Sequence, residues 1–402
     1  MNQSTLQQLS EFYERALLED CLPFWFPRCV DHEHGGYLHC VDRDGTLVDT
    51  DKSIWAQGRM SWMLGSLACD PFLNAHSCRD DWDRWSAWGT TFLQNHGFDR
   101  QTVSSDGRMF FHVTRDGRPI RKRRYAYSES FAAIAFAAQA RLRSSEALAK
   151  EAMELLRFFV RWNFTPGLMP PKSTDVRPSI GLAPRMITIV TAQELRDCLG
   201  EHNELTSWID RCIHEIDQWF VKPDLKCVME CVAPNGEVLD HFDGRTLNPG
   251  HAIEGAWFIL REAQHRSDSQ LLQLGCKMLD WMWERGWDQE HGGLLYFCDD
   301  YGRPVQEYWH DMKFWWPHDE ALIATLFAWK LTGEQRYMDW HNKLKQWAFQ
   351  HFGDPEFGEW YGYIHRDGRI SSRAKGTMYK GPFHLPRMLW YCARLCDEMK
   401  SK

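Results

Sequence analysis

One short pattern recurs along this chain of 402 residues and limits what it can fold into. Residues 31–36 (DHEHGG) recur as residues 288–293 (DQEHGG) and, more loosely, as residues 354–359 (DPEFGE). Weaker copies occupy residues 107–117 and 227–236. Each copy leads through a short aromatic or apolar segment to a second glycine. Such a glycine-bounded segment is typical of a hairpin, so we predict a small β-ribbon at each copy.

Between the ribbons, apolar residues follow helical spacing. The helical windows are residues 52–69, 81–96, 126–142, 145–162, 184–199, 203–220, 249–265, 268–285, 315–331 and 334–352, with segments 5–28 and 378–399 completing the set. The spacing of the copies places a sixth, degenerate ribbon near residues 163–175, a proline-rich stretch. The repeats therefore predict twelve helices in six pairs.

Helix pairs of this kind cannot each bury an apolar face alone, and a closed ring of pairs solves that problem. We therefore predict an all-α fold, an (α/α)6 barrel with short β-hairpins in the connecting loops and a cleft at the loop end. An open array of repeats is the alternative, but it would need polar capping helices, whereas segment 378–399 is as apolar as the interior windows. The absence of a linker or a shift in composition predicts a single domain over residues 1–402.

Charge and composition exclude several classes of function. The net charge is −8, with 47 basic and 55 acidic residues mixed along the chain, so a nucleic-acid footprint is missing. No run of eighteen apolar residues occurs, and the thirteen cysteines form no CxxC pair. We expect a cytoplasmic protein that contacts neither membrane nor nucleic acid. The 21 tryptophans suit either a sugar site or a large core.

Two predicted helix starts combine histidine with carboxylates. In residues 248–257 (NPGHAIEGAW), Asn caps the helix, and His251 and Glu254 are three residues apart, so they share one face. In residues 313–320 (KFWWPHDE), Lys313 and Trp316 precede His318 and Glu320. The structural alternatives are a capping histidine in the first segment and a core tryptophan pair beside an ordinary acidic first turn in the second.

Two further helices carry an isolated polar residue. His384 begins the last helix, where the positive helix terminus favours a neutral imidazole, the form that a general base needs. Arg59 lies within an aromatic helix and needs a polar partner inside the ring unless it extends out between helices. Taken singly, such residues are more often structural than catalytic. A closed ring, however, would bring all four segments to one end and into one cleft.

Other chemistries lack their motifs here. The sequence has no HExxH, GxGxxG, phosphate loop or GxSxG, so we expect no metal, no cofactor and no serine nucleophile. What remains is acid–base chemistry by two imidazoles, which suits moving a proton on and off a carbon next to a carbonyl group.

Several strings in one order resemble the N-acylglucosamine 2-epimerase family. They are NPGH (248–251), KFWWPH (313–318), GEWYGY (358–363) and FHLPR (383–387), supported by residues 31–37 and 55–59. The likeness runs from about residue 5 to 399. It implies an (α/α)6 barrel and interconversion of N-acetylglucosamine and N-acetylmannosamine, or of related free sugars, at C2.

The resemblance also implies roles for residues. His251 and His384 resemble the paired acid–base histidines, and Arg59, Glu254 and Glu320 resemble the residues around the sugar. We add Trp316, His318 and Lys313 as substrate-binding residues because they share the same helix start. The resemblance leaves open which histidine serves which face of C2.

The sequence alone leaves three functions open. The first is a sugar 2-epimerase, the second an aldose–ketose isomerase of the mannose-to-fructose type that uses the same residues, and the third a binding protein without activity. Residues 377–379 and Pro382 depart from the family pattern beside the expected acyl pocket. The expected partner is a small sugar, and a homodimer stays open.

Overall fold

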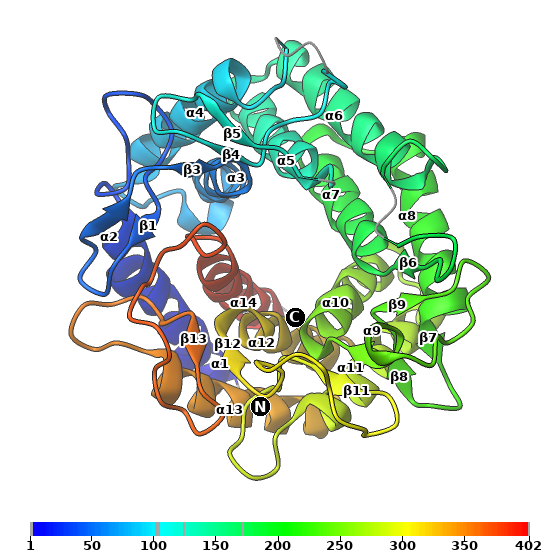
Figure 1. Ribbon diagram of the computed structural model, residues 1–402. Coiled ribbons are helices and arrows are strands. Elements are labelled where there is room, and N and C mark those ends of the chain that lie inside the picture. Colours follow the sequence, from blue (N-terminus) through cyan, green and yellow to red (C-terminus); the bar gives the residue numbers. More distant parts are fainter. Residues whose placement is uncertain (1–2, 101–104, 124, 171–172, 401–402) are drawn as a thin grey trace.

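The computed structural model describes residues 3–100, 105–123, 125–170 and 173–400, and within them twelve long helical segments form two concentric rings (Figure 1). The inner ring comprises α3 (Ile54–Cys69), α5 (Tyr127–Arg143), α7 (Ala183–Leu199), α10 (Pro249–Arg266), α12 (Trp315–Thr332) and α14 (His384–Lys400). The outer ring comprises α1 (Gln3–Arg15), α4 (Arg79–His96), α6 (Glu146–Phe164), α8 (Asn203–Glu215), α11 (Ser269–Gly286) and α13 (Gln335–Phe352). The predicted (α/α)6 barrel is confirmed.

Shorter helical pieces extend this frame. A π-helical turn at Ala16–Cys21 and α2 (Leu22–Trp25) continue α1, and another π-helical turn at Ile216–Phe220 continues α8. A 3₁₀ turn at Pro71–Leu73 follows α3, and the one-turn helix α9 (Phe242–Arg245) lies among the loops.

Burial explains which helices lie inside. Helix α12 is buried on every side from Trp315 to Ala328, as expected for a helix enclosed by neighbours. Helix α8 instead buries one stripe that includes Leu205 and Ile209, as a surface helix does. The helix starts follow the expected capping chemistry: the side chain of Asn248 accepts a hydrogen bond from the His251 backbone N–H at 3.1 Å.

The two ends of the chain close the ring. Helices α1 and α14 pack against each other as the sixth outer–inner pair, and the Ser10 hydroxyl donates to the Ala393 carbonyl at 3.1 Å. On the inner side, Trp62 of α3 lies 6.2 Å from Trp390 of α14 between ring centroids. The apolar last helix therefore serves as an interior element, and the open array is wrong.

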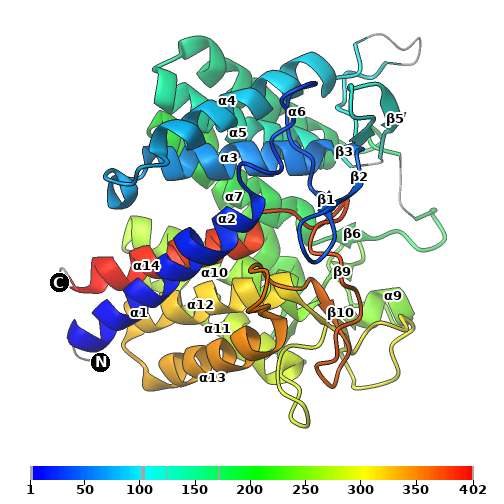
Figure 2. The same ribbon diagram turned by 90° about the vertical axis from the view of Figure 1, so that its left-hand side faces the viewer.

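The ribbons all lie at one end of the barrel, while both termini lie at the other (Figure 2). The strands are β1 (Cys40–Val41), β2 (Leu47–Asp49), β3 (Lys52–Ser53), β4 (His112–Val113), β5 (Pro119–Arg121), β6 (Ile180–Gly181), β7 (Val221–Lys222), β8 (Cys227–Val228), β9 (Cys231–Val232), β10 (Thr246–Leu247), β11 (Cys298–Asp299), β12 (Lys313–Phe314) and β13 (Tyr363–Ile364). All pairs are antiparallel: β1–β2, β3–β4–β5, β6–β9, β7–β8, β10–β11 and β12–β13.

The ribbons were predicted as local hairpins, and the structure adds pairing between repeats. The three best copies each close with a single bridge: Val30–Tyr37, Trp287–Leu294 and Gly353–Trp360. Strand pairs β3–β4, β6–β9, β10–β11 and β12–β13 then join ribbons that follow one another around the ring. The proline-rich stretch leads to β6 instead of a copy of the motif, and residues 171–172 within it lie outside the described residues.

A buried ion cluster lies under each of the three best copies. The Asp that opens the copy binds a buried Lys at 2.8 Å and an Arg from another ribbon. The three sets are Asp31 with Lys52 and Arg115, Asp288 with Lys313 and Arg366, and Asp354 with Lys375 and Arg43. Burial alone would raise the pKa of Asp288, but Arg366 and Lys313 outweigh burial and hold this pKa well below its usual range.

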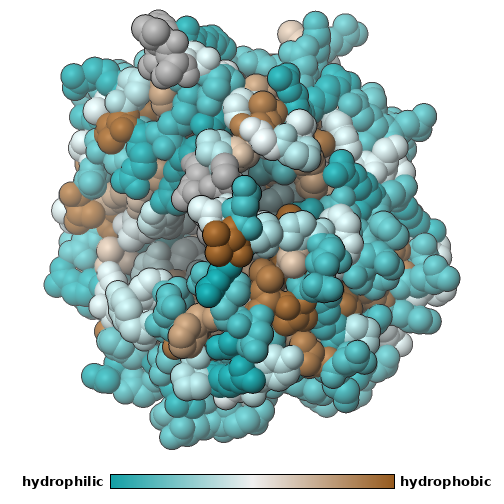
Figure 3. Space-filling view, turned by 45° about the vertical axis from the view of Figure 1, so that its right-hand side comes forward, coloured by the Kyte–Doolittle hydropathy of each residue, from teal (hydrophilic) through white to brown (hydrophobic). Residues whose placement is uncertain are grey.

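The outer surface is mainly hydrophilic. On the face shown in Figure 3, hydrophobic side chains gather near the middle, where the surface is hollowed. Among the described residues, no helix combines the length and the apolar character that crossing a membrane requires.

We expect Asp288→Asn to destabilise the fold by about 3 kcal/mol at pH 7, because it leaves the fully buried Lys313 without its carboxylate and also removes the partner of the half-exposed Arg366. The folded-state pKa of Asp288 is lowered, so its contribution is present above the unfolded-state value of about 4 and is lost as pH falls below it. Urea unfolding at pH 7 and at low pH measures both effects. Asp367→Asn, at an exposed ion pair with Arg369, is the control and should change stability little. An unchanged free energy of unfolding in Asp288→Asn would remove the cluster from the determinants of the fold.

Candidate active site

The ribbon-end cavity, defined by the residues at the starts of the inner helices, has a volume of about 430 Å³. Its charged and imidazole side chains are Arg59, Glu254, His251, His384, Arg387 and Glu194, with Trp316 and Trp55 among its aromatic walls. All six inner helices begin at this end of the barrel. Their positive ends therefore surround the cavity and favour negative charge in it. The four predicted helix starts meet here, as the closed ring requires.

His384 is held from behind by a carboxylate. Its Nδ1 lies 2.7 Å from Oε1 of Glu320, and the indole N–H of Trp257 donates to the other Glu320 oxygen at 2.8 Å. Arg387 donates to the same Oε1 at 2.6 Å and so neutralises the Glu320 charge. Burial, then the charges of Arg387 and Arg59, lower the pKa of His384 well below its usual value. His384 is therefore neutral at physiological pH, with Nδ1–H donating to Glu320.

His251 has a different setting. Its Nδ1 lies 3.0 Å from each carboxylate oxygen of Glu230, and no described cation pairs with Glu230. Burial on its own would lower the pKa of His251, but Glu230, with smaller effects from Glu254 and Glu320, outweighs burial and raises this pKa. The two histidines of one cavity are thus driven toward opposite protonation states, which suits one acid and one base.

The indole of Trp316 lies beside both imidazoles. Its ring centroid is 5.0 Å from that of His251 and 5.9 Å from that of His384. Neither histidine uses Nε2 in a hydrogen bond to a described residue, and both line the cavity. Each imidazole can therefore exchange a proton with a molecule bound over Trp316.

Arg59 is a cation that forms no ion pair with another described residue. Its guanidinium lies 4.1 Å from the ring centroid of Phe131 and 4.7 Å from that of Phe383, and no described residue accepts a hydrogen bond from it. Burial lowers the pKa of Arg59 to about 10, so it keeps its charge at neutral pH. A partly buried guanidinium that packs on two rings and has no hydrogen-bond acceptor among the described residues can receive an oxyanion from a bound molecule.

One set of candidate metal ligands occurs among the described residues: Glu254, Glu320 and His384, whose ligand atoms lie within 4.8 Å of one another. One guanidinium nitrogen of Arg387 lies among them, 2.8 Å from Glu254, 2.6 Å from Glu320 and 3.4 Å from Nδ1 of His384. A metal ion would have to displace this cation, so the donor set as folded fits arginine and does not fit a metal.

The structure does not support two of the predicted substrate contacts. Lys313 is fully buried against Asp288 beneath a ribbon, outside the cavity. His318 is also fully buried and holds the backbone: its Nε2 accepts from the Leu294 N–H at 2.9 Å, and its Nδ1 lies 2.6 Å from the Phe314 carbonyl. Burial lowers the pKa of His318 to about 3, so it stays neutral and serves these two bonds.

The sequence predicted most of the polar residues of the cavity but not all of the residues that support them. Arg59, Glu254, Trp316 and both paired histidines line the cavity as predicted, whereas Glu320 lies behind His384. Arg387 and Glu230 were missed. Arg387 could have been found, since it follows His384 by three residues and shares its helix face. Glu230 lies in a weak copy of the repeat and carries no such signal.

One wall of the cavity is apolar. It is formed by one side of α7 with a contribution from α5, namely Ala183, Met186, Ile187, Val190 and Ile134. Arg59, His251, Glu254, His384 and Arg387 come from α3, α10 and α14, and α7 adds Thr191 and Glu194 further along the helix. A ligand held here would therefore meet hydrogen-bonding groups on one side and hydrocarbon on the other.

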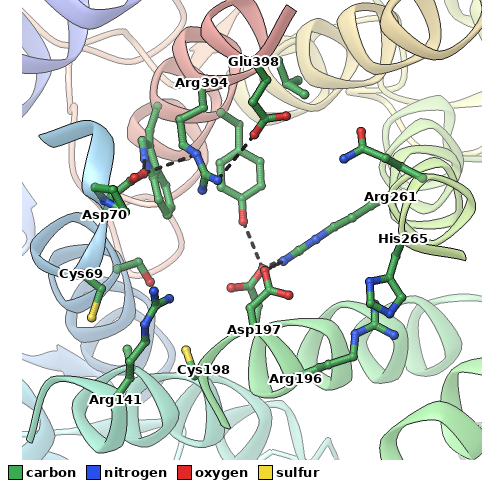
Figure 4. A pocket seen from close by; sticks show the side chains of 18 of the residues that line it. Cys69, Asp70, Arg141, Arg196, Asp197, Cys198, Arg261, His265, Arg394 and Glu398 are labelled. Carbon is green, nitrogen blue, oxygen red and sulfur yellow. Dashed lines mark hydrogen bonds and ion pairs between the residues drawn. The ribbon is translucent and has the colours of Figure 1, made fainter. Parts of the chain in front are cut away.

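A second cavity of about 400 Å³ lies at the opposite end, where the inner helices finish (Figure 4). Its carboxylates already have partners: Arg261 binds Glu194 at 2.5 Å and Asp197 at 2.6 Å, and Arg394 lies 3.4 Å from Asp70. Glu194 lines both cavities and accepts a hydrogen bond from the Trp62 indole N–H. This basal network closes the barrel floor, whereas the paired histidines and the free arginine lie only at the ribbon end.

We expect His318→Ala to lower stability by about 2–3 kcal/mol without lowering the catalytic rate constant. The variant leaves the Leu294 N–H and the Phe314 carbonyl without their partner, and neither belongs to the cavity's polar groups. Urea unfolding and turnover of the folded variant test this, with His365→Ala on an exposed turn as the control. A large fall in the catalytic rate constant with normal stability would contradict this prediction and would indicate that His318 binds the substrate.

Comparison with known proteins agrees with this geometry. A family model described as N-acylglucosamine 2-epimerase (GlcNAc 2-epimerase) matches residues 36–380. The N-acylglucosamine 2-epimerase of Bos taurus is 34% identical over 415 residues, covering 100% of this chain and 94% of the bovine protein. That of Homo sapiens is 33% identical, covering 95% and 88%.

Solved structures share the fold at lower identity. Cellobiose 2-epimerase from Bacillus thermoamylovorans B4167 has a TM-score of 0.82 at 19% identity, covering 97% of this chain and 99% of that one. A D-mannose isomerase has a TM-score of 0.80 at 17% identity, covering 96% and 98%. The chain therefore belongs to the N-acylglucosamine 2-epimerase family and is an isomerase.

Proposed function

We propose that this enzyme inverts C2 of N-acylglucosamine and N-acylmannosamine, or of a closely related free sugar. One observation carries the proposal: two histidines with opposite protonation tendencies face one cavity beside an unpaired guanidinium. Inverting a carbon next to a carbonyl needs a base on one face, an acid on the other and a cation for the oxygen between them.

The chemistry starts with ring opening, because the C2 hydrogen is acidic only when C1 is an aldehyde. One imidazole Nε2 then removes the C2 proton, and the C2–H electron pair forms a C1=C2 double bond while the C1 oxygen takes the negative charge. Arg59 is positioned to stabilise that oxyanion, together with the positive helix ends. The other imidazole returns a proton to the opposite face of C2, and the C1 carbonyl forms again.

The opposite pKa shifts of the two histidines indicate which of them removes the C2 proton. The neutral His384 acts as the base, and His251, whose raised pKa favours its protonated form, acts as the acid, for the epimer whose C2 hydrogen faces His384. The other epimer reacts in the opposite direction. Glu320 fixes the His384 tautomer from behind, and Arg387 keeps that carboxylate from drawing a proton onto the imidazole.

The N-acyl substrate class is supported by the apolar wall. Ala183, Met186, Ile187 and Val190 give hydrocarbon contacts that an acyl methyl group can bury and that a sugar hydroxyl cannot satisfy. The bovine and human relatives, at 34% and 33% identity, carry the N-acylglucosamine name.

An aldose–ketose isomerase is the second candidate, because the same histidines could return the proton to C1 instead of C2. A D-mannose isomerase is similar to this chain at 23% identity over 138 residues. That outcome needs a hydroxyl at C2, since a nitrogen at C2 cannot yield a simple 2-ketose.

Incubation with N-acetylmannosamine and with mannose, in separate reactions, distinguishes the candidates. We expect conversion of N-acetylmannosamine to N-acetylglucosamine, and proton NMR of the sugar measures this conversion. Formation of fructose from mannose, with the N-acetyl sugar untouched, would favour the isomerase. No conversion of either sugar, with intact binding, would favour a protein without activity.

Arg59→Lys should lower the catalytic rate constant at least about tenfold, because lysine keeps the charge but loses the planar fork that fits between Phe131 and Phe383. Steady-state kinetics and circular dichroism measure rate and folding. A near-normal rate in a folded Arg59→Lys protein would demote Arg59 to a packing residue.

His251→Ala and His384→Ala should each abolish net epimerisation, at a cost of about 10² to 10⁴ in rate for a lost acid–base group. Each variant should still exchange the C2 hydrogen of one epimer with D₂O, namely the epimer that presents this hydrogen to the surviving histidine. The two variants should therefore exchange opposite epimers. Proton NMR of each sugar with each folded variant measures this.

Epimerisation at close to the normal rate by either variant would contradict the two-base assignment. Glu254, which lines the cavity and is buried, would then be the next candidate for the missing base.

A further inference from the structure

We propose that Glu230 is the positioning residue of His251, fixing which imidazole nitrogen faces the cavity and which of the two histidines rests as the acid. This inference rests on the proposed function, since it takes His251 as an acid–base group. Glu230 lies in the turn between β8 and β9 and is not among the residues that line the cavity. It therefore acts through the imidazole and not on the sugar.

The contact engages the whole carboxylate. Both oxygens of Glu230 lie 3.0 Å from Nδ1 of His251, so the Nδ1–H donates to Glu230 and Nε2 is left for the cavity. No other hydrogen bond or ion pair joins the Glu230 side chain to a described residue. The carboxylate has one function in this fold, which is to hold this ring.

The backbone of Glu230 is fixed by the barrel. Its carbonyl accepts a hydrogen bond from the Leu182 N–H at 3.0 Å, next to the start of α7. The following residue, Cys231, pairs with Gly181 in the β6–β9 ladder. The turn is thus joined to an inner helix on one side of the cavity while its side chain reaches α10 on the other. Such a support holds the ring orientation without relying on a mobile loop.

The two histidines differ in what neutralises their carboxylates. Glu320 behind His384 receives Arg387 at 2.6 Å and the Trp257 indole N–H at 2.8 Å. Glu230 behind His251 receives neither a cation nor a second donor from the described residues. An uncompensated carboxylate favours a charged imidazole, and a compensated one does not. This difference in carboxylate partners shifts the two imidazole pKa values in opposite directions, in addition to the effect of Arg59 on His384.

Other charged or titratable groups face this pair from every side. Glu254 lies on the same helix as His251, Glu320 on α12, and His384 and Arg387 on α14. Tyr127 and Tyr296 also lie near Glu230, and burial, followed by the charge of Glu230, raises the pKa of each phenol. Glu254 and Glu320 already share the cation Arg387. Removing Glu230 would therefore leave burial as the main influence on His251, and burial favours the neutral ring.

This assignment determines which of the two epimers the resting enzyme accepts. A protonated His251 with a neutral His384 accepts the epimer whose C2 hydrogen faces His384. One turnover moves a proton from C2 to His384 and another from His251 to C2, which leaves the histidines in exchanged states. Glu230 on one side and Arg387 on the other then favour return of a proton from solvent to His251 and loss of one from His384, restoring the resting state.

The test compares Glu230→Gln with the native enzyme by NMR titration of histidine side chains labelled with ¹⁵N. The His251 signals are identified by their loss in His251→Asn. We expect the titration midpoint of His251 to fall by at least about one pH unit in Glu230→Gln. Glu230→Asp, which keeps the charge, should recover part of that fall. Glu237→Gln, at an exposed carboxylate on the next turn, is the matched control and should leave the midpoint unchanged.

Kinetics supply a second readout that a purely structural role would not move. The alkaline limb of the pH–rate profile, which reports loss of the acid, should move to lower pH in Glu230→Gln by about the same amount as the midpoint. The catalytic rate constant at pH 8 should fall while KM changes little, because Glu230 does not touch the sugar. Glu230→Asp should restore part of the profile.

An unchanged His251 midpoint in a folded Glu230→Gln protein would overturn the inference, as would an unchanged pH profile in an enzyme that turns over sugar. The NMR titration needs no turnover. If no sugar were converted by the native enzyme, the proposed function would fail while the titration still decided whether Glu230 sets the state of His251. Should Glu230→Gln fail to fold, the same titration on Glu230→Asp decides. We then expect the titration midpoint of His251 to fall by less than about one pH unit, and a midpoint that does not fall would contradict the assignment.

Discussion

Three buried Asp–Lys–Arg clusters hold the ribbon end of the barrel together. In each, the Lys comes from the segment that leads into an inner helix, and the Arg comes from a neighbouring ribbon. The pair of Arg43 and Asp354 joins the first ribbon to the last, so the ring of ribbons closes where the ring of helices does. Replacing a buried ion pair by apolar residues often costs little, whereas leaving one partner unpaired costs several kcal/mol. We therefore regard these clusters as specifying one arrangement of the ribbons, more than as a source of net stability. The cavity depends on that arrangement, because the ribbons position the helix starts that line it.

Sequence periodicity predicted this architecture because each repeat buries the same surfaces. The window 249–265 became α10 (Pro249–Arg266), and the window 334–352 became α13 (Gln335–Phe352). The last window was wrong at its beginning: residues 378–383 are not helical, and α14 begins at His384, after Gly381 and Pro382. Pairing between ribbons was also missed, because strands of two or three residues carry no usable alternation and their partners lie far away in the sequence.

The site was predicted in part, and the errors have a geometric cause. Trp316, His318 and Glu320 lie within five residues, but successive residues of a helix point about 100° apart. Trp316 therefore faces the cavity, while His318 lies under a ribbon and accepts the Leu294 N–H. Two earlier inner helices carry the same device: Gln57 accepts the Tyr37 N–H, and Glu129 accepts the Met109 N–H. Aligning the repeats at these positions would have marked His318 as a structural residue. The same comparison would have marked Lys313 as structural, since Lys52 binds the equivalent aspartate in the cluster of the first repeat.

The direction of the inner helices favours the proposed acid–base chemistry at the ribbon end of the barrel and ion pairs at the other end. All six inner helices run from the ribbons toward the basal cavity, so their positive ends surround the histidines and their negative ends meet at the floor. At the floor, arginines such as Arg141 and Arg196 lie in the last turns of their helices, where a cation offsets the carbonyl ends. At the ribbon end the proposed reaction would itself supply negative charge. Arg59 and the helix starts form a positive environment that would stabilise an enolate oxygen in the proposed reaction. The two histidines of one cavity can have pKa values shifted in opposite directions because each contacts its own carboxylate at short range, while the helix ends act on both alike.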